Sequence, residues 1–489
     1  MRGAWTTERV RAAEDTVMAR TKPGELMRRA AFALAAHAAG MLGEHRGRVP
    51  GSKVVLLVGA GNNGGDALWA GAFLRKRGAQ VTALLLDPER AHEEGLAALR
   101  KERGRVIPVS LLGEEITQAV GDADLVIDGI VGLSARGGLR QTAAALVEAA
   151  DGVPILAVDL PSGVNPDTGE VDGEAVYADE TVTFGCRKPG HLLGAGVKHS
   201  GTVHVVDIGI GDELGEPDVA ALEPAEVGAL WPVPGPSDDK YTQGVSGIAA
   251  GSTAYPGAAV LSAGAAVAAT SGMVRYAGSV ADQVVARWPE VVASKSITDA
   301  GRVQAWAVGP GIGVGESAHS LLKHVFAAGV PVVLDADAIT VLAKQPELLD
   351  LRDPEVPLVF TPHDREFIRL FGEIGTDRPA AVREAARKHN AVVLLKGNTT
   401  IIADPDGQVL VHNARTAWPA TAGSGDVLTG LITALVAAGR PPILAAAAAV
   451  LVHHLAAELA AAGAPIGASA LLEHIPDAIR TVRAAHSAR

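Results

Sequence analysis

Short apolar runs alternate with helical stretches along most of the chain. In the first half, runs of strand length occupy residues 53–58, 81–86, 125–127, 155–158, 180–184 and 203–207. A second series occupies residues 245–250, 305–308, 330–334, 358–360, 391–395 and 399–403. Continuous apolar runs separated by helices are typical of parallel sheets covered on both faces. Ligands of such sheets bind beyond the carboxyl ends of the strands.

Two regions are predicted to be helical. The first is residues 7–40, a segment whose first half mixes polar and apolar residues and whose second half is apolar. The second is residues 427–461, where apolar residues recur with helical spacing. The most apolar stretch, residues 443–455, is largely alanine and contains His453 and His454. It is too short to span a bilayer, which needs about 20 apolar residues. We therefore expect a buried helix there and no membrane partner.

A domain boundary is visible where the periodicity fades, between residues 211 and 237. Trp231 begins a Trp-Pro-Val-Pro-Gly-Pro connector there, which is stiff. At 489 residues the chain also exceeds one typical core. The sequence thus predicts an α/β fold of two tandem three-layer domains, residues 1–213 and 237–489, joined by a linker at 214–236.

Composition narrows the partners and the compartment. The net charge of −12, without a basic tail, argues against nucleic acid as a partner. Cys186 is the only cysteine, which excludes an internal disulfide and fits a reducing compartment. The first 30 residues carry many charges and no signal-peptide pattern. We expect a soluble, cytoplasmic protein. A homo-oligomer is also expected, because alanine-rich helices can be buried against a second subunit as readily as against a sheet.

The most informative motif lies between residues 420 and 430. Gly423, Ser424 and Gly425 precede Asp426, and an apolar helical pattern follows. Unpaired N–H groups at such a helix start can hold a developing negative charge. Asp426 can then take a proton from an attacking hydroxyl, which indicates phosphoryl transfer to an alcohol. In the alternative, Asp426 only caps the helix. The chain has no Gly-x-x-x-x-Gly-Lys-Ser/Thr loop, so it is not a P-loop enzyme.

Further loops of the second half follow predicted strands and can converge at one sheet edge. They comprise residues 255–261, 308–313, 361–366 and 394–400. Each is a weak signal alone. His363 alone is more often a helix cap or a solvated residue than a ligand contact, and Lys396 is either a phosphate contact or a surface charge.

The first half has a glycine loop after its first strand. Gly59, Gly61 and Gly64 match the dinucleotide fingerprint and support a rival interpretation as a nicotinamide-dependent dehydrogenase. We discount it because Asp66 would lie close to the bound pyrophosphate, and because the pair Asn62-Asn63 has no role in that fingerprint.

Three more loops of the first half carry polar groups, at residues 127–132, 133–138 and 158–163. Their carboxylate and hydroxyl oxygens suit a hard cation, and their glycine N–H groups suit phosphate. In the alternative, Asp128 and Asp159 only end strands and organise turns.

Taken together, the motifs at 62–66, 128–129 and 159–163 resemble those of NAD(P)H-hydrate epimerases, over residues 7–210. The resemblance implies a Rossmann-like epimerase domain with Asp159 as the acid/base. It also implies a potassium ion bound by Asn63, Asp128 and Ser162. The hydrated dinucleotide would be held by Asn62, Asn63, Gly64, Gly65, Asp66, Gly132, Leu133, Ser134, Ala135, Arg136, Gly137, Gly138 and Asp159. One departure is Ala67, where the family usually has glycine and where a methyl group could crowd the loop.

The second half resembles the ADP/ATP-dependent NAD(P)H-hydrate dehydratases, a ribokinase-like family, over residues 235–489. The resemblance rests on the motifs at 255–258, 309–311, 335–338, 361–363, 396–397 and 425–426. It implies that Asp426 is the catalytic base and that Mg²⁺ offsets the charge of the nucleotide. The hydrated dinucleotide would lie at Ala258, Gly311, His363 and Asp426, and the nucleotide along Lys396, Gly397, Asn398, Thr399 and Thr400 and at Gly425. Ile339-Thr340 and Asp364-Arg365 depart from the residues common in the family.

The two resemblances together imply a bifunctional metabolite-repair enzyme. Its N-terminal domain would interconvert the R and S hydrates NADHX and NADPHX, and its C-terminal domain would dehydrate the S form. The tandem order looks bacterial, which implies ADP as donor, with AMP and phosphate as products. Two alternatives stay open. The second half could be a vitamin or sugar kinase, or the first half could be a non-catalytic dinucleotide-binding module, although a scaffold has no need of Asp66, Asp128, Asp159 and Ser162.

Overall fold

The computed structural model describes residues 1–109, 113–133 and 137–488. The chain forms two compact units, Gly3–Val219 on one side and Met1–Arg2 with Ala220–Arg489 on the other. The division falls within two short strands, β1 (Arg2–Ala4) and β9 (Val219–Ala221). We call the two units the N-terminal unit and the C-terminal unit and describe each by itself.

The N-terminal unit is built on a parallel sheet with the strand order β4-β3-β2-β5-β6-β7-β8. The strands are β2 (Lys53–Val58), β3 (Gln80–Leu85), β4 (Arg105–Pro108), β5 (Leu125–Gly129), β6 (Ile155–Val158), β7 (Glu180–Phe184) and β8 (Thr202–Val206). The α-helices are α1 (Thr7–Met18), α2 (Glu25–Arg46), α3 (Asn62–Lys76), α4 (Glu93–Lys101), α5 (Glu114–Gly121), α6 (Gln141–Glu148) and α7 (Gly196–His199). Short 3-10 turns are η1 (Pro88–Arg90), η2 (Pro189–His191) and η3 (Gly211–Glu213).

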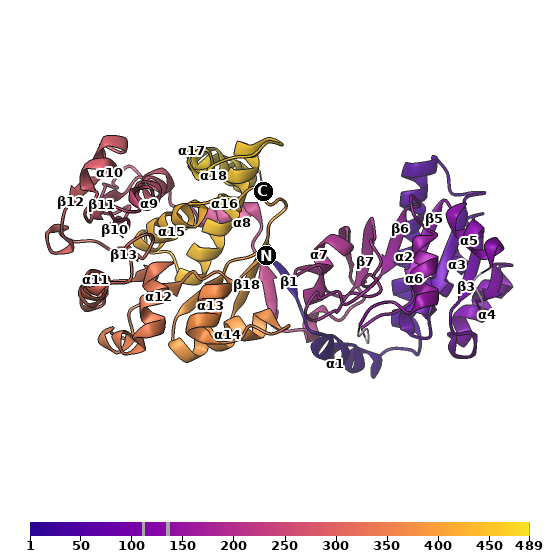
Figure 1. Ribbon diagram of the computed structural model, residues 1–489. Coiled ribbons are helices and arrows are strands. Elements are labelled where there is room, and N and C mark those ends of the chain that lie inside the picture. The colour runs from indigo at the N-terminus through magenta and orange to yellow at the C-terminus, as the bar shows by residue number, and fades with distance from the viewer. Residues whose placement is uncertain (110–112, 134–136, 489) are drawn as a thin grey trace. The chain divides into compact units, whose positions relative to one another are not determined.

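Helices cover both faces of this sheet, as the parallel pattern predicts (Figure 1). Side chains of α1, α2, α3 and α4 form the core on one face, and side chains of α5 and α6 form the core on the other. The strand order reverses between β2 and β5, so the loops that follow these two strands diverge at the carboxyl edge of the sheet. This is the position where open α/β sheets bind ligands.

The C-terminal unit has a longer sheet with the order β9-β18-β17-β16-β15-β14-β13-β10-β11-β12. Its strands are β10 (Val245–Ala249), β11 (Met273–Ala277), β12 (Val292–Ser294), β13 (Ala305–Val308), β14 (Val332–Leu334), β15 (Leu358–Phe360), β16 (Val392–Leu395), β17 (Thr399–Ala403) and β18 (Val409–Asn413). Neighbours from β12 to β16 pair in parallel, whereas β17 is antiparallel to both β16 and β18. The strand order reverses between β10 and β13, which marks the ligand-binding edge of this unit.

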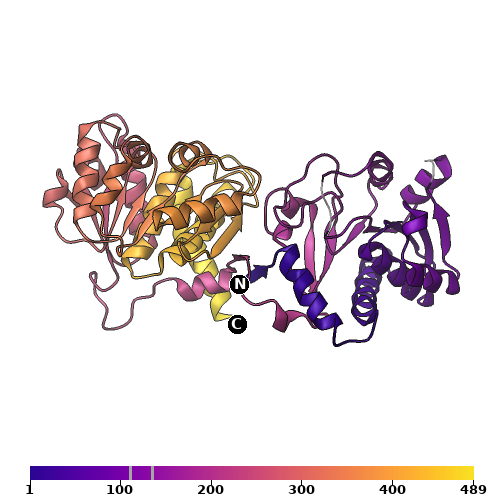
Figure 2. The ribbon, with the colours of Figure 1, turned by 90° about the horizontal axis from the view of Figure 1, so that it is seen from below.

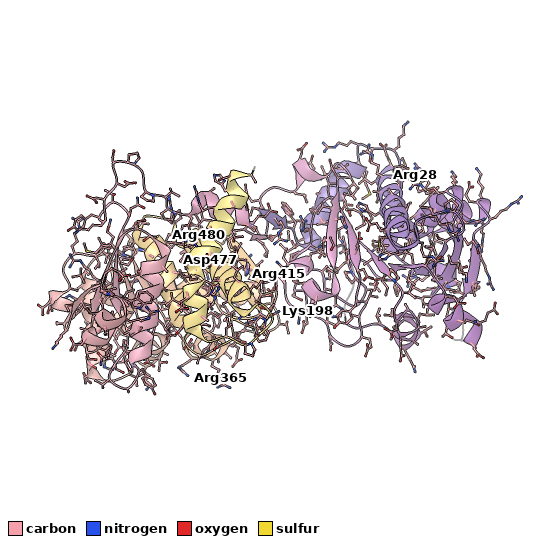
Figure 3. The ribbon with its side chains drawn as sticks, turned by 90° about the horizontal axis from the view of Figure 1, so that it is seen from above. Arg28, Lys198, Arg365, Arg415, Asp477 and Arg480 are labelled. Carbon is pink, nitrogen blue, oxygen red and sulfur yellow. The ribbon has the colours of Figure 1, made fainter. Side chains whose placement is uncertain are left out.

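Helices flank the C-terminal sheet on both faces (Figure 2). They are α8 (Pro224–Leu230), α9 (Pro256–Ala269), α10 (Ala281–Arg287), α11 (Glu316–Ala327), α12 (Asp337–Lys344), α13 (Asp364–Phe371), α14 (Arg378–His389), α15 (Ser424–Ala437), α16 (Pro442–Ala461), α17 (Ala468–Glu473) and α18 (Ile475–Ser487), with 3-10 turns η4 (Ile297–Asp299) and η5 (Pro346–Leu351). Charged residues such as Asp477 and Arg480, an ion pair one turn apart on α18, lie at the surface (Figure 3).

Small residues let the helices of the C-terminal unit pack closely. A Cβ at Gly430 of α15 would lie 2.3 Å from the carbonyl oxygen of Ser262 on α9, so only glycine fits there. The alanines of α9 and α16 are mostly buried in the same core. The alanine-rich helices are therefore packed within their own unit. The prediction of a homo-oligomer stays a prediction.

The predicted helix at 7–40 is wrong in one respect, because two helices occupy this region. Pro23 and Gly24 separate α1 from α2, and Gly24 has a φ of 71°, which no continuous helix accepts. The region 427–461 is likewise divided into α15 and α16, by a turn that contains Gly439, with φ 77°. Glycine and proline end these helices where apolar periodicity alone predicts continuation.

The length argument against a membrane span is also corrected. Helix α16 spans 20 residues with a mean hydropathy of 1.8 over its most apolar window, so by length and composition it can cross a membrane. In the structure, 67% of that window is buried inside the protein. Its burial, rather than its length, makes it a core helix.

Candidate active sites

The glycine loop after β2 brings three chain segments into close contact in the N-terminal unit. The N–H of Gly59 donates to the carbonyl of Gly129 at the end of β5 (3.0 Å). A Cβ at Gly59 would lie 1.9 Å from the carbonyl oxygen of Ile130, and a Cβ at Gly64 would lie 2.3 Å from that of Gly59. Both glycines are thus required by packing. The methyl group of Ala67 is fully buried, and it fits because its neighbour is Gly129, where a Cβ would lie 2.8 Å away.

The three predicted potassium ligands, Asn63, Asp128 and Ser162, are brought together by this arrangement. Asn63 donates from Nδ2 to the carbonyl of Val158 (2.6 Å). Its Oδ1 faces Gly132, where a Cβ would lie 2.4 Å away. The hydroxyl of Ser162 donates to Oδ1 of Asp128 (2.7 Å), and the N–H of Ser162 donates to Oδ2 (2.8 Å). Three loops therefore supply the amide, carboxylate and hydroxyl oxygens of one small region.

The charge on Asp128 makes this region suitable for a cation. Its side chain is 1% exposed, and burial raises the pKa of Asp128, while the Ser162 hydrogen bonds lower it in part. In the described ranges 1–109, 113–133 and 137–488, no cationic side chain forms an ion pair with Asp128. A buried carboxylate with only neutral donors fits K⁺, because K⁺ prefers hard oxygen ligands.

The predicted dinucleotide loop at 132–138 is only partly described. Gly132 lies against Asn63, and Leu133 packs against the core of the unit. Gly137 has a φ of 71°, in the left-handed region that favours glycine. Ser134, Ala135 and Arg136 lie outside the described residues.

Asp159 has the environment of a functional carboxylate. It follows β6 with a φ of 66°, a strained backbone conformation for a residue other than glycine. Its Oδ1 accepts hydrogen bonds from Lys188 Nζ (2.5 Å) and Thr183 Oγ1 (2.9 Å). Burial raises the pKa of Asp159, but the charge and hydrogen bond of Lys188 outweigh burial, so the pKa lies below its ordinary value. Asp159 is therefore held as a carboxylate.

Lys188 and His191 follow β7 and hold Asp159 in place. Lys188 is 1% exposed and also donates to Thr183 Oγ1 (3.0 Å) and the carbonyl of Phe184 (3.2 Å). His191 accepts from the N–H of Lys188 at Nδ1 (3.1 Å), so its Nε2 carries hydrogen and donates to the carbonyl of Asp159 (3.0 Å). Burial, followed by the charge of Lys188, lowers the pKa of His191 to about 3, so the imidazole is neutral. No role was predicted for these two residues from the sequence; the available signal was the Lys-Pro-Gly-His run at 188–191, shortly after the predicted strand at 180–184.

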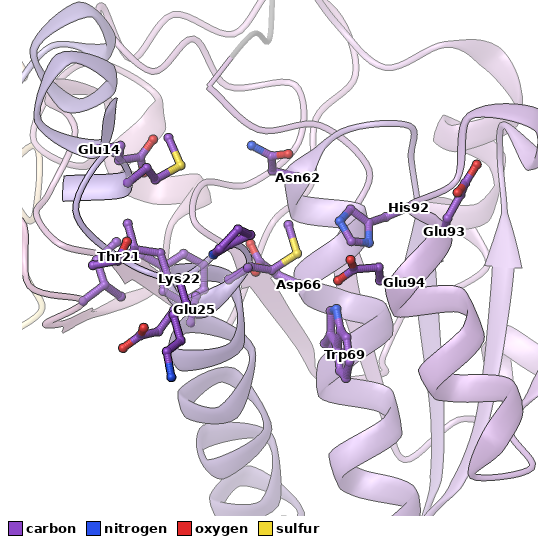
Figure 4. A pocket seen from close by; sticks show the side chains of 18 residues that line it. Glu14, Thr21, Lys22, Glu25, Asn62, Asp66, Trp69, His92, Glu93 and Glu94 are labelled. Carbon is purple, nitrogen blue, oxygen red and sulfur yellow. The ribbon is translucent and has the colours of Figure 1, made fainter. Parts of the chain in front are cut away.

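Asp66 lines a pocket of 590 Å³ in the N-terminal unit, together with Asn62, Glu14 and Trp69. Figure 4 shows Asn62 and Asp66 at the start of α3, with Glu14 reaching the pocket from α1. Burial, and then the negative charges of Asp159 and Glu14, raise the pKa of Asp66 well above its ordinary value. Among the described residues, its Oδ1 has no hydrogen-bond partner. The pKa values of Asp66 and Asp159 are thus shifted in opposite directions, and carboxyl groups with separated pKa values are typical of acid/base sites.

In the C-terminal unit, the predicted loops do meet at one sheet edge. The loops after β10, β13, β14, β15 and β16 follow neighbouring parallel strands. Gly309 has a φ of 132° and lies so close to Asp335 that a Cβ would be 1.8 Å from its carbonyl oxygen. Gly311 lies beside Ala258, where a Cβ would be 3.1 Å from the alanine Cβ. The predicted contacts Ala258 and Gly311 are therefore neighbours.

A charge pair of the buried Asp335 and the partly buried Lys396 lies next to the start of α15. Lys396 Nζ donates to Oδ1 of Asp335 (2.7 Å), and Thr429 Oγ1 donates to Oδ2 (2.9 Å). A Cβ at Gly425 would lie 3.6 Å from Lys396 Nζ. The lysine ammonium is thus adjacent to the helix N-terminus, and the two together create a region that favours anions.

Asp426 lies in the first turn of α15 and has a shifted pKa. Burial and the negative charge of Asp335 raise the pKa of Asp426 to about 7, although Lys396 lowers it in part. A general base is most effective when its pKa lies near the operating pH. The N-cap of α15 is Gly423, and among the described residues no side chain caps this end of the helix by a hydrogen bond.

The backbone at the start of α15 leaves amide groups without an acceptor inside the helix. Gly423 has a φ of 85°, and the first intrahelical bond runs from Val427 to its carbonyl (3.3 Å). The N–H groups of Gly425 and Asp426 precede this bond and have no acceptor within the helix. His453 on α16 donates from Nε2 to the carbonyl of Ser424 (2.9 Å), and burial lowers the pKa of His453 to about 4. Neutral His453 thus fixes this turn, another contact that the sequence analysis left unassigned.

The remaining predicted residues have structural roles in part. His363 caps α13 by accepting from the N–H of Glu366 at Nδ1 (3.3 Å), as one of the two interpretations held, and its ring stays half exposed. Thr399 and Thr400 start β17, and their hydroxyls bond to Asn413 (2.6 Å) and Gly397 (3.3 Å). Gly397 and Asn398 are exposed between β16 and β17. These two lie beside Lys396 and are open to a ligand.

Comparison with known proteins agrees with both halves of this description. Residues 23–190 match the family described as YjeF-related protein N-terminus, and residues 246–480 match the family of NAD(P)H-hydrate dehydratases. A bifunctional NAD(P)H-hydrate repair enzyme of Mycobacterium leprae (strain TN) is 50% identical over 98% of this chain and 99% of its own length. One of Corynebacterium glutamicum is 37% identical over 89% of this chain and 87% of its own length.

A solved structure supports the fold. A ribokinase-like superfamily protein of Enterococcus faecalis V583 is 22% identical, covers 54% of this chain and 96% of its own length, and has a TM-score of 0.50. The predicted α/β fold, with a ribokinase-like C-terminal unit, is confirmed. From the similarity over almost its whole length, this chain belongs to the family of bifunctional NAD(P)H-hydrate repair enzymes.

Proposed function

We propose that this protein repairs hydrated NADH and NADPH in two steps. The N-terminal unit interconverts the R and S hydrates, and the C-terminal unit dehydrates the S form with ADP, giving NAD(P)H, AMP and phosphate. The observation that carries the proposal is the position of Asp426. It lies in the first turn of α15, where the helix start favours anions, and its pKa is raised to about 7. Membership of the repair-enzyme family supports the substrate assignment.

The dehydration requires a better leaving group than hydroxide. In our proposal, Asp426 accepts the proton of the ring hydroxyl as this oxygen attacks the terminal phosphorus of ADP. The phosphoanhydride bond breaks, and AMP leaves. The C–O bond of the phosphorylated ring then breaks and phosphate departs with the bonding electrons, and loss of a proton from the neighbouring ring carbon to solvent restores the conjugated dihydronicotinamide. The N–H groups around Gly423 to Gly425 and the ammonium of Lys396 would stabilise the negative charge of the transferring group.

We place the ligands of this step along the sheet edge. The hydrated dinucleotide would lie at Ala258, Gly311, His363 and Asp426, and ADP along residues 396–400 and at Gly425. Mg²⁺ binds phosphates and one or two carboxylates, and Asp335 and Asp337 are close enough to raise the pKa of Asp426. Their charge fits a divalent cation, which would offset the charge of the nucleotide.

For the epimerase step we propose Asp159 as the base and Asp66 as its acidic counterpart. The lowered pKa of Asp159 and the raised pKa of Asp66 support these opposite roles. K⁺ would be held by Asn63, Asp128 and Ser162, where it would balance the buried charge of Asp128. The substrate would lie against residues 62–66 and 132–138. A cytoplasmic location is supported by the single cysteine, Cys186, which is buried and unpaired.

Product stoichiometry tests the proposed reaction. The full chain would be incubated with S-NADHX, Mg²⁺ and ADP, and NADH, AMP and inorganic phosphate would be measured. We expect equal amounts of the three products. A phosphorylated product that accumulates without release of phosphate would instead indicate an ordinary kinase and would overturn the proposal, as would NADH formation that consumes no nucleotide.

A further inference from the structure

A cluster of two histidines and a glutamate lies on the N-terminal unit, outside the proposed reaction centre. His37 comes from α2, Glu180 begins β7, and His204 lies within β8. Nε2 of His204 is 2.8 Å from Oε2 of Glu180, and the rings of His37 and His204 are 4.7 Å apart. One donor atom from each of the three residues lies within 4.8 Å of the other two.

Strand register places the three side chains on one face. Glu180 pairs with Thr202, and Val182 pairs with His204, so Glu180 and His204 belong to the same face of neighbouring strands. Helix α2 packs against β7 on this face. Thr183, which contacts Asp159, alternates to the other face. Glu180 begins β7, and Phe184 ends it at the carboxyl edge of the sheet, where the proposed reaction centre lies. The two residues are about 13 Å apart along the strand, because strands rise roughly 3.3 Å per residue.

The contact between His204 and Glu180 is close, but it is not a hydrogen bond. Its geometry leaves Nε2 of His204 buried and without a hydrogen-bond partner in the part of the chain that the structure describes. Nε2 of His204 and Oε2 of Glu180 therefore lie close together without a hydrogen bond. This arrangement is expected when both atoms are ligands of the same metal ion. The side chains of His204 and Glu180 are 33% and 24% exposed, so solvent can reach the cluster.

The spacing and the chemistry of the donors fit a transition-metal ion. Zn²⁺ is held by imidazole nitrogens and carboxylate oxygens at about 2.1 Å in tetrahedral geometry, which puts neighbouring ligand atoms roughly 3.4 Å apart. The separations here, from 2.8 Å to within 4.8 Å, bracket that value.

We propose that His37, Glu180 and His204 form a binding site for a divalent transition-metal ion such as Zn²⁺, with solvent as the fourth ligand. The site is distinct from the potassium site and from both reaction centres. Because β8 is the edge strand of the sheet, the ion links that edge to α2. Its role is to stabilise the N-terminal unit.

Metal titration of the full chain tests this site. Protein freed of metal with a chelator would be titrated with ZnCl₂ by calorimetry and with CoCl₂ by visible absorption, for wild type, His204→Gln, Glu180→Gln and His37→Gln. His45→Gln, on the exposed end of α2, is the matched control. We expect one tight Zn²⁺ site in wild type and His45→Gln, a cobalt spectrum of tetrahedral type, and binding at least about 100-fold weaker in the three site variants.

Thermal unfolding provides the second readout. Zn²⁺ should raise the unfolding midpoint of wild type and His45→Gln but not of the site variants, which are first compared with wild type by circular dichroism without metal. Activity on NADHX should be the same with and without Zn²⁺. Absence of a stoichiometric site, or equal Zn²⁺ affinity in wild type and in every folded site variant, would overturn the proposal.

Discussion

The ammonium of Lys188 lies 2.5 Å from Oδ1 of Asp159, and the two side chains are 1% and 6% exposed. An ion pair this deeply buried is costly to desolvate, and it is stable only because Thr183 and backbone carbonyls bond to it as well. The pair keeps Asp159 charged at the carboxyl edge of the sheet. The glycine loop after β2 lies at this edge, as does the oxygen cluster of Asn63, Asp128 and Ser162.

Replacing Lys188 by methionine should damage both stability and epimerisation. The charge of Asp159 would stay buried without its partner, which typically costs about 3–5 kcal/mol of unfolding free energy. The pKa of Asp159 would rise, because burial would then be opposed only by His191 and the hydrogen bond from Thr183. Urea denaturation and the rate of R-to-S conversion measure the two effects. Lys198→Met, at an exposed lysine nearby in the chain, should change neither; equal stability of the two variants would contradict the account.

The rate of dehydration should depend on the ionisation of Asp426. A base acts only when deprotonated, so kcat/KM should fall about tenfold per unit as the pH drops below about 7. Asp335→Asn removes a negative charge that raises the pKa of Asp426, so the midpoint of the profile should move to lower pH. Rate measurements on both proteins test this. They should cover about two pH units on each side of the Asp426 pKa of about 7. A midpoint that stays or moves upward would count against Asp426 as the base.

Gly425→Ala should reduce dehydration without destabilising the fold. A Cβ at this position would meet Lys396 Nζ at 3.6 Å and Asp335 Oδ2 at 3.7 Å, which are ordinary contacts. Alanine also favours a helix by up to about 1 kcal/mol over glycine. The methyl group would nevertheless occupy the space beside the proposed anion hole, where loss of one donor costs about 10²–10³ in rate. Gly315→Ala, with no atom within 4 Å of the new Cβ, is the control. An unchanged kcat in Gly425→Ala would contradict the assignment of the anion hole to the start of α15.

Potassium should be required for epimerisation only. Asp128 is the charged member of the oxygen cluster, so Asp128→Asn should weaken K⁺ binding and slow R-to-S conversion. Replacing K⁺ by tetramethylammonium should slow the wild type in the same way and leave Asp128→Asn little affected. Dehydration of pure S-NADHX by the same samples serves as the internal control. Epimerisation that proceeds at full rate without K⁺ would contradict the assignment.

Much of the fold was predictable from apolar periodicity. The predicted strands at 53–58, 155–158 and 180–184 coincide with β2, β6 and β7. The strands β4, β11, β12 and β18 were missed, because each has partly exposed positions and so lacks the continuous apolar run of a fully buried strand. The single helix predicted at 7–40 failed because periodicity continues across Pro23 and Gly24, where the backbone does not.

The candidate sites were predictable where glycine and acidic residues follow a strand. Motif and strand order together place Asp128 near the end of β5 and Asp159 directly after β6, and the glycine motif places Asp426 in the first turn of α15, as the structure has them. The partners Lys188, His191 and His453 were not predictable, since their contacts depend on the folding back of loops and of α16. A lysine in a loop usually lies in solvent, and only its burial distinguishes Lys188.

The most direct test of the account measures recovery of NADH from an equal mixture of R- and S-NADHX. Wild type, Asp159→Asn and Asp426→Asn would be compared with ADP and Mg²⁺, over a time in which spontaneous epimerisation is slow. The account predicts full recovery by wild type, recovery of the S half alone by Asp159→Asn, and none by Asp426→Asn. Recovery at the wild-type rate by Asp426→Asn, or full recovery by Asp159→Asn, would contradict it.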